Sequence, residues 1–284
     1  MSALRKALVA VMAMVFAACG ASAIPPTSGT MAPLATPADV IVLGDFGSGS
    51  DAQYAVAESI RKTVAEVDVE LLLTTGDNFY NDDIDRIWNE PYGWLEGEDI
   101  RIAATWGNHD VETDTRRELV RGSLHPPGEY YTVDLGAGKL IVLDSNSVSD
   151  TDQTRWFRDQ LEAAGPPAIV IFHHPPYSCG VYGTEDVVND FWLPIIEEFE
   201  VPLVINGHEH HYERLNVEGT TYVVTGGGGQ SLRSPRGCPE DTPEPLASNY
   251  REHHFVLMRV GDSRISARVI TAEGSTIDAF EIDY

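Results

Sequence analysis

Basic side chains are scarce in this sequence of 284 residues, which has 19 lysines and arginines against 44 aspartates and glutamates and a formal net charge of −25. Such an acidic field repels polyanions, so it disfavours nucleic acids and anionic membrane surfaces as partners. It is compatible with small substrates and with high solubility. The charge does not indicate which reaction the protein carries out.

Long hydrophobic runs are also lacking, which excludes a protein with several membrane spans. The apolar stretch ALVAVMAMVFAA at 7–18 is shorter than the roughly 20 residues that cross a bilayer. It follows the basic residues Arg5 and Lys6 and precedes small residues, and this pattern is typical of a secretory signal peptide over 1–23. We therefore expect an exported protein without a transmembrane span, either secreted, periplasmic or held at the cell envelope by a lipid.

Two kinds of processing fit the end of this signal. The small residues Ala-Ser-Ala at 21–23 suit an ordinary signal peptidase, whereas FAAC at 16–19 resembles a bacterial lipoprotein box in which Cys19 carries the lipid. The following segment, 24–37, is rich in Pro, Ser, Thr and Gly and is typical of a flexible linker. Residues 38–284 are then expected to form one folded domain.

Cysteine is the third scarce residue type, with three copies. Apart from Cys19, these are Cys179 and Cys238, and in an exported protein thiols are usually oxidised. We predict a disulfide between them. A pair of free thiols is the alternative, because the sequence does not fix the distance between the two loops that carry them.

Short apolar runs alternate with helix-like segments from residue 39 onward, which indicates an α/β fold. Five runs are predicted to be buried strands, at 40–43, 71–75, 102–105, 168–172 and 203–205. Helices are expected at 52–67 with Asp51 as N-cap, at 154–164, and at 186–200 with a kink or restart at Pro194.

Hairpins are expected in two further places. The runs at 130–135 and 139–143 flank Gly-Ala-Gly, and the segment 255–282 contains three runs separated by turn residues. Strand–helix alternation followed by hairpins predicts a four-layer α-β-β-α sandwich, in which two mixed sheets are flanked by helices.

Polar side chains that can bind metals follow each of the five predicted strands. They are Asp45, Asp77, Asn108, His173 and His208, with Tyr80 and His210 close behind. Ligands of open α/β sheets bind beyond the carboxyl ends of the strands, so one site can collect all seven. Each alone has an ordinary structural explanation, such as an aspartate in a turn. Together they predict a metal centre.

The motifs GDFG (44–47), GDNFY (76–80), GNHD (107–110), VIFH (170–173) and GHEH (207–210) resemble, in order, the five motifs of purple acid phosphatases. These enzymes are a branch of the calcineurin-like metallophosphoesterases. Gly47 stands where most metallophosphoesterases carry a histidine, and Tyr80 supplies the missing ligand, as in the purple enzymes. The resemblance implies a hydrolase in which a hydroxide bound to two metal ions attacks a phosphate monoester directly.

The resemblance also implies how the ligands divide between the two metals. One ion is expected to be held by Asp45, Asp77, Tyr80 and His210, and the other by Asn108, His173, His208 and the shared Asp77. The first set offers three anions and the second is neutral apart from Asp77, so a trivalent ion suits the first and a divalent ion the second. We expect Fe(III) beside Fe(II), Zn(II) or Mn(II). The alternative for Tyr80 is simple packing over its turn.

His109 is the catalytic candidate, because it resembles the family's histidine near the leaving group, where it can contact phosphate or donate a proton. Its alternative role is to orient Asn108. The family often places histidines nine or ten residues after the position of His173, but here Tyr182 and Gly183 occupy those positions. The second acid or substrate contact is therefore unassigned, and the substitutes are His174, Tyr177, Tyr182 and His211.

Small phosphorylated molecules are the expected substrates. Phosphodiesterase or nucleotidase activity at the same site is the alternative, because loops such as 81–99 and 230–250 decide which leaving group fits. A non-catalytic metal or phosphate binder is less compatible with a complete ligand set, and oxidative di-iron proteins draw their ligands from bundled helices. The run Gly226–Gly229 lacks the Gly-Lys-Ser/Thr of a nucleotide-binding loop, and we expect a tight turn beside the site.

Overall fold

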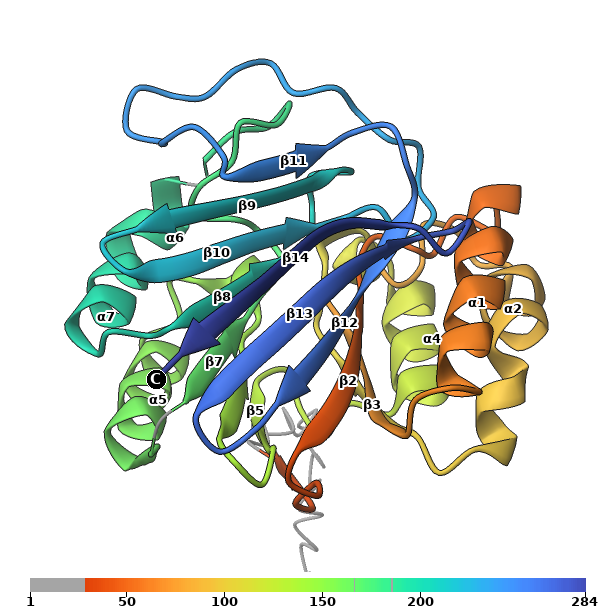
Figure 1. Ribbon diagram of the computed structural model, residues 1–284, viewed down its shortest axis with the longest axis horizontal. Coiled ribbons are helices and arrows are strands. Elements are labelled where there is room, and N and C mark those ends of the chain that lie inside the picture. Colours follow the sequence, from red (N-terminus) through yellow and green to blue (C-terminus); the bar gives the residue numbers. More distant parts are fainter. Residues whose placement is uncertain (1–28, 166, 185) are drawn as a thin grey trace, which may run out of the picture.

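The computed structural model describes residues 29–165, 167–184 and 186–284. Within these residues two mixed β-sheets pack face to face, and helices cover the outer face of each sheet (Figure 1). The predicted four-layer sandwich is thereby confirmed. The predicted signal peptide, Cys19 and the first part of the predicted linker lie outside the described residues. Along the described ranges, no helix has the length and apolar character needed to cross a membrane.

One sheet, in its described part, has the strand order β14-β13-β12-β2-β3-β4. Its strands β2, β3 and β4 run parallel to one another, and the C-terminal strands β12, β13 and β14 add an antiparallel meander beside β2. The strands are β2 (Ala38–Leu43), β3 (Val69–Thr74), β4 (Arg101–Ala104), β12 (His254–Val260), β13 (Arg264–Thr271) and β14 (Thr276–Asp283). The three strands expected near the C-terminus are confirmed.

The other sheet, in its described part, has the order β1-β5-β6-β7-β8-β10-β9-β11. The hairpin of β5 and β6 is antiparallel as expected, and β6, β7 and β8 run parallel. The strands are β1 (Gly29–Met31), β5 (Tyr131–Asp134), β6 (Lys139–Val142), β7 (Ala168–Ile171), β8 (Leu203–Asn206), β9 (Tyr212–Val217), β10 (Thr220–Thr225) and β11 (Ala247–Asn249). Strand β1 belongs to the segment expected to be a linker, and it pairs with β5.

The central strands are buried on both faces, which explains their continuous apolar sequences. In β2, Val40 and Val42 contact the other sheet, whereas Ile41 and Leu43 face the helices. All four are at most 1% exposed, and burying each such side chain contributes roughly 1.5–3 kcal/mol. This core holds the carboxyl ends of the parallel strands in fixed positions.

The helices over the first sheet are α1 (Asp51–Val64), α2 (Glu90–Tyr92), α3 (Asn108–Val111) and α4 (Asp114–Leu124), with a π-helical turn η1 (Asp85–Asn89) and a 3-10 turn η2 (Gly93–Gly97). The predicted N-cap of α1 is wrong by one residue. Ser50 is the cap, because its side chain accepts a hydrogen bond from the amide of Gln53, while Asp51 is the first helical residue. Helix α4 was not predicted.

The helices over the second sheet are α5 (Thr151–Ala163), α6 (Asp186–Phe191) and α7 (Leu193–Glu198), with a 3-10 turn η3 (Ser145–Ser147). Pro194 is the second residue of α7, so the expected restart at this proline is confirmed. The β9–β10 hairpin was not expected, because Glu213 and Arg214 interrupt its apolar pattern. In the structure Glu213 contacts His211 and Arg214 contacts Asp278, so both charges are paired.

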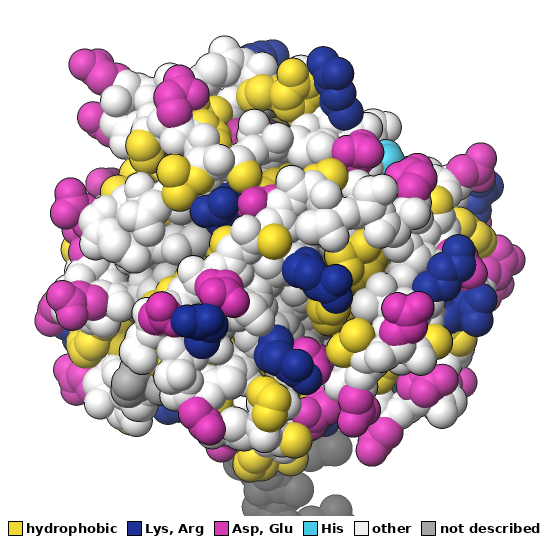
Figure 2. All heavy atoms as spheres, viewed as in Figure 1, with side chains coloured by type: hydrophobic (Ala, Val, Ile, Leu, Met, Phe, Trp, Pro, Cys, Tyr) yellow, Lys and Arg dark blue, Asp and Glu magenta, His cyan; other side chains and the backbone are white. Residues whose placement is uncertain are grey.

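The surface reflects the charge balance of the sequence. Figure 2 shows acidic side chains spread over the visible face, with several basic side chains over the strands β12 to β14. Some of these charges pair within the meander, as Arg264 does with Glu281 and Asp283. Exposed pairs of this kind contribute roughly 0–1 kcal/mol each, so they do not determine the fold.

Candidate functional site

The carboxyl ends of parallel strands from both sheets meet at one place. Asp45 follows β2 and Asp77 follows β3 in one sheet, whereas His208 follows β8 in the other. The amide of His208 donates a hydrogen bond to Oδ2 of Asp45 over 3.0 Å, and Nδ1 of His173 lies 2.9 Å from the carbonyl oxygen of Thr75. Direct contacts therefore join the two sheets at the predicted site.

Three of the candidate ligands have left-handed backbone conformations, which are uncommon for residues with side chains. Their φ angles are +53° for Asp45, +54° for Asp77 and +71° for His208. Such strained residues cluster at functional sites, where the surrounding structure holds them. The glycines that precede these residues allow neighbouring loops to approach closely. A Cβ atom on Gly207 would lie 2.5 Å from Oδ2 of Asp45.

The first group of candidate ligands is Asp45, Tyr80 and His210. The phenol oxygen of Tyr80 lies 3.1 Å from Oδ1 of Asp45 and 3.1 Å from Nε2 of His210, and the latter two atoms are 3.5 Å apart. The other ring nitrogen of His210 lies 3.0 Å from the carbonyl oxygen of Ser231. That contact fixes the ring and turns Nε2 towards the other two side chains.

The second group is Asn108, His173 and His208. The side-chain oxygen of Asn108 lies 3.2 Å from Nε2 of His173 and 3.1 Å from Nδ1 of His208. Oδ1 of Asp77 lies 3.4 Å from Nε2 of His173, and ligand atoms of Asp45, Asp77 and His173 all fall within 4.8 Å of one another. The structure thus brings together all seven residues that the sequence singled out, with Asp77 next to both groups.

Burial and neighbouring charges shift the pKa values of several residues in the site. Burial raises the pKa of Asp45 well above its ordinary range. Burial, together with the charges of Asp45 and Asp77, also raises the pKa of Tyr80 well above 10. Burial acts to raise the pKa of Asp77 as well. The opposite effect of the neighbouring His173 is larger, so the pKa of Asp77 lies below its usual range. Burial acts to lower the pKa of His173, but the negative charge of Asp77 has the larger effect and raises this pKa to about 10.

The remaining two histidines are held neutral, which is the form that binds metals. Burial and the neighbouring His173 lower the pKa of His208 to about 2. Burial and the positive charge of Arg233 lower that of His210 to about 4. Burial favours the protonated forms of Asp45 and Tyr80, and Asp77 favours that of His173, so in each of these a proton holds a position that a cation can take. This set of donors fits cations, because a cation compensates the buried negative charges.

A buried carboxylate that the sequence analysis did not assign holds two of the ligand loops together. Asp110 is fully buried, and its oxygens accept hydrogen bonds from the side chain of Asn78 and from the amides of Phe79 and Gly107, over 2.8, 3.0 and 2.9 Å. It therefore couples the loop that follows β3 to the loop that follows β4. The motif GNHD contained this residue, but its sequence position does not reveal that it contacts the other loop.

The catalytic candidate His109 lies at the edge of the site. Its amide donates to Oδ1 of Asp77 over 2.9 Å, and its ring packs on Tyr80 with centroids 4.5 Å apart. Nδ1 of the ring lies 3.2 Å from Glu112, and the side chain is 38% exposed. Since Nδ1 is occupied by Glu112, Nε2 is the nitrogen that a substrate can reach.

Of the proposed substitutes for the missing histidines, Tyr182 and His174 adjoin the site. The ring of Tyr182 lies 4.7 Å from that of His208, and His174 lies 4.6 Å from His208 while its Nδ1 contacts the hydroxyl of Ser145 over 2.8 Å. Tyr177 packs on Tyr222 in the core instead, with centroids 5.0 Å apart. His211 is buried against Glu213, so it also points away from a substrate.

The run Gly226–Gly229 passes beside the site as expected. A Cβ atom on Gly226 would lie 2.9 Å from Oδ2 of Asp45, and the amide of Gly228 donates to the carbonyl of Gly44 over 2.8 Å. Arg233, which lies outside the five motifs, also adjoins the site, because its amide donates to the carbonyl oxygen of His210 over 3.0 Å. A single arginine in a loop gives no sequence signal of this position.

Comparison with known proteins agrees with this geometry. The chain is 24% identical over 262 residues to purple acid phosphatase 7 of Arabidopsis thaliana, covering 79% of each chain. It is 25% identical over 193 residues to a probable cyclic nucleotide phosphodiesterase of Psychrobacter arcticus, covering 61% of this chain and 68% of that one.

Among solved structures, purple acid phosphatase PPD1 from yellow lupin (Lupinus luteus) seeds shares the fold, with a TM-score of 0.75 and 18% identity. The match covers 88% of this chain and 54% of the lupin chain. The family model for calcineurin-like phosphoesterases matches residues 38–212, more than half of the sequence, and that range includes all seven candidate ligands. The chain therefore belongs to the calcineurin-like phosphoesterase family.

Proposed function

We propose that this protein is a dinuclear-metal hydrolase of phosphate monoesters, similar in chemistry to purple acid phosphatases. The observation that carries the proposal is the crowding of acceptor atoms at the strand ends. Oδ1 of Asp45, the oxygen of Tyr80 and Nε2 of His210 lie within 3.1–3.5 Å of one another. Beside them, the oxygen of Asn108 lies within 3.1–3.2 Å of two imidazole nitrogens.

The first metal, in this proposal, is Fe(III) held by Asp45, Asp77, Tyr80 and His210. The second is Fe(II), Zn(II) or Mn(II) held by Asn108, His173, His208 and the shared Asp77. The raised pKa of Tyr80 supports the division, because this phenol becomes a phenolate ligand only beside a strongly acidic cation. Imidazole and amide ligands accept all three divalent ions.

When bound, two such ions would supply Lewis acidity towards phosphate and would lower the pKa of water into the neutral range. The residues of the chain contribute position and proton transfer. Asp77 links the two ligand groups. It also positions His109, because its Oδ1 accepts a hydrogen bond from the backbone amide of His109 over 2.9 Å. His109 has its Nδ1 held by Glu112, and its Nε2 contacts the phosphate or protonates the leaving oxygen.

The test of this proposal combines metal analysis, an absorption spectrum and turnover of p-nitrophenyl phosphate by purified protein. We expect iron, a visible phenolate-to-iron band and hydrolysis of the ester. In Tyr80→Phe the band should disappear while the fold persists, since the phenyl ring still packs against His109. Active, colourless protein without iron would refute the metal assignment, and iron-loaded protein without turnover would refute the hydrolase.

Phosphodiesterase activity is the alternative at the same site. The similarity to the probable cyclic nucleotide phosphodiesterase of Psychrobacter arcticus favours it, although the two purple acid phosphatase matches each cover a larger part of this chain. Comparing p-nitrophenyl phosphate with bis(p-nitrophenyl) phosphate separates the two activities. A higher kcat/KM for the diester would favour the alternative.

Export is the second part of the proposal. The disulfide between Cys179 and Cys238 is typical of an oxidising compartment, as is the signal-like segment 1–23. Mass spectrometry of the mature N-terminus tests whether cleavage precedes Cys19 or follows the Ala-Ser-Ala segment at 21–23. If Cys19 carries a lipid, Cys19→Ser should move the protein from the membrane fraction to the soluble fraction of a bacterial host.

A further inference from the structure

Arg233 is a cation at the edge of the site, and one of its nitrogens has no partner. Nη1 of its guanidinium is buried and, among the described residues, no hydrogen bond reaches it. Buried polar groups in folded proteins are nearly always satisfied, and guanidinium most strongly prefers carboxylate or phosphate oxygens. The backbone of Arg233 is bonded to that of His210 over 3.0 Å, so the residue adjoins a candidate ligand.

Tyr182 connects Arg233 to the centre of the site. The guanidinium carbon of Arg233 lies 4.8 Å from the centroid of the Tyr182 ring, and that ring lies 4.7 Å from the ring of His208. Stacking on an aromatic ring orients a planar guanidinium and leaves its edge free for hydrogen bonds. Tyr182 is 54% exposed, so this contact lies at the protein surface beside His208.

The loop of Tyr182 is held by a buried carboxylate. The side chain of Glu209 is fully buried and accepts hydrogen bonds from the amides of Val181, Tyr182 and Gly183. A Cβ atom on Gly180 would lie 2.2 Å from the same carboxyl group, so a larger residue there would displace the Glu209 side chain. Glu209 lies between the candidate ligands His208 and His210, and the site itself thus determines where Tyr182 stands.

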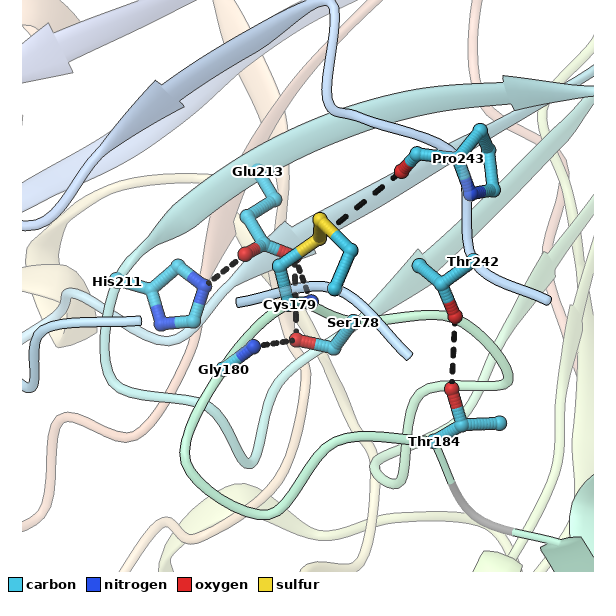
Figure 3. The surroundings of a disulfide bond; sticks show 9 residues. Ser178, Cys179, Gly180, Thr184, His211, Glu213, Thr242 and Pro243 are labelled. Carbon is cyan, nitrogen blue, oxygen red and sulfur yellow. Dashed lines mark hydrogen bonds and ion pairs between the residues drawn. A yellow bond between two sulfur atoms is a disulfide. The ribbon is translucent and has the colours of Figure 1, made fainter. Parts of the chain in front are cut away.

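A disulfide ties this loop to the loop of Arg233. Cys179 is bonded to Cys238, and the amide of Arg236 donates to the carbonyl of Cys179 over 3.1 Å. Figure 3 shows the bond beside Glu213, which accepts hydrogen bonds from the hydroxyl of Ser178 and the amide of Cys179. The same figure shows the hydroxyls of Thr184 and Thr242 joining the two loops, 3.1 Å apart.

We propose that Arg233, positioned by Tyr182, binds the phosphoryl oxygens of the substrate and makes the site selective for dianionic phosphate monoesters over monoanionic diesters. This inference rests on the proposed function. A monoester phosphate carries close to two negative charges at neutral pH, since its second pKa is about 6. A diester carries one, so a fixed cation favours the monoester. Arg233 with Tyr182 would then take the place of the histidines that the family motif leads one to expect.

The test compares Arg233→Gln with the parent protein in three measurements. These are kcat/KM for p-nitrophenyl phosphate, kcat/KM for bis(p-nitrophenyl) phosphate, and calorimetric binding of inorganic phosphate. We expect the monoester value and the phosphate affinity to fall roughly 10- to 100-fold, as for a lost hydrogen bond to a charged group. The diester value should fall less than about threefold. Arg233→Lys should give values between those of the parent protein and Arg233→Gln, because lysine keeps the positive charge but lacks the paired N–H donors of the guanidinium.

Two further variants complete the design. Arg236→Gln removes the same charge from the same loop, and it should change none of the three measurements because its side chain is exposed. Tyr182→Ala should repeat the loss seen in Arg233→Gln, whereas Tyr182→Phe should not, since the ring supports the guanidinium. Metal content and unfolding midpoint are measured for every variant to separate local from global effects.

The outcomes are distinct. Equal losses on both esters in Arg233→Gln, or unchanged phosphate affinity, overturn the inference. A parent protein that cleaves neither ester overturns the proposed function. In that case phosphate calorimetry with Arg233→Gln still decides whether Arg233 binds phosphate.

Discussion

The amide of Tyr80 donates a hydrogen bond over 2.9 Å to the carbonyl oxygen of Gly47, at the position where the sequence motifs of most metallophosphoesterases lead us to expect a histidine. The two loops touch so closely here that a Cβ atom on Gly47 would lie 1.9 Å from the carbonyl oxygen of Asn78. Glycine at 47 and tyrosine at 80 therefore form one structural unit. The missing side chain lets the second loop approach, and that approach places the phenol between Asp45 and His210.

Gly47→Ala should disturb this unit directly. The added methyl group meets backbone atoms, which cannot rotate away, so we expect a loss of roughly 1–3 kcal/mol in the free energy of unfolding and weaker visible absorption. Urea denaturation and the spectrum check both. The matched control is Gly122→Ala in α4, where a Cβ atom meets nothing within 4 Å. Equal stability of the two variants would contradict the tight contact at Gly47.

Asp77→Asn should remove activity, because Asp77 is the residue shared by both proposed ligand groups. The amide keeps an oxygen that can accept from the amide of His109, so the loop geometry is preserved while the charge is lost. We expect kcat/KM to fall more than about 100-fold. Mutating a residue that only orients a metal ligand already lowers metal affinity or activity by about 10- to 100-fold. Metal content should fall in parallel. Asp51→Asn, at the exposed start of α1, is the control. Undiminished turnover in Asp77→Asn would reject its shared role.

Asp144 should give stability a measurable pH dependence outside the site. Burial raises its pKa from 3.8 to about 6. The folded state therefore binds more protons than the unfolded state between these values, and stability falls as pH rises through this window. The full effect is roughly 3 kcal/mol, because one pKa unit corresponds to about 1.4 kcal/mol.

Asp144→Asn should remove this dependence, since it has no proton to lose and still offers an oxygen to the amide of Asn146, 3.0 Å away in the parent protein. Urea denaturation at pH 4.5 and pH 7 measures the difference, with the exposed Asp159→Asn as control. A variant that loses stability as steeply as the parent between the two pH values rules out Asp144 as the source.

The disulfide should stabilise the fold by closing a long loop. Cys179 and Cys238 are 59 residues apart in sequence, and chain-entropy estimates for such a loop give about 4 kcal/mol as an upper value. The double variant Cys179→Ser, Cys238→Ser should therefore unfold at lower urea concentration. Reducing agent should lower the parent protein to the same midpoint and leave the variant unchanged. Identical midpoints without reductant would mean that the bond contributes no stability.

The sequence by itself predicted the parts of this protein that depend on local order. Apolar runs followed by Gly-Asp, Gly-Asn or Gly-His marked the strands and the candidate ligands, because side-chain alternation and turn residues are local properties. The five motifs in fixed order predicted the family, which the comparison confirmed. The disulfide was also predicted, although only from the compartment and the small number of cysteines.

Which distant groups meet became evident from the folded structure. Three such contacts are that of Asp110 with the loop after β3, those of Glu209 with the Tyr182 loop, and the stacking of Arg233 on Tyr182. All three depend on packing between segments far apart in the chain. A single sequence has no period or spacing that records such contacts. The strand ends were foreseeable because a parallel sheet aligns them, whereas the loops that surround the substrate are placed by side-chain packing, and that is set in three dimensions.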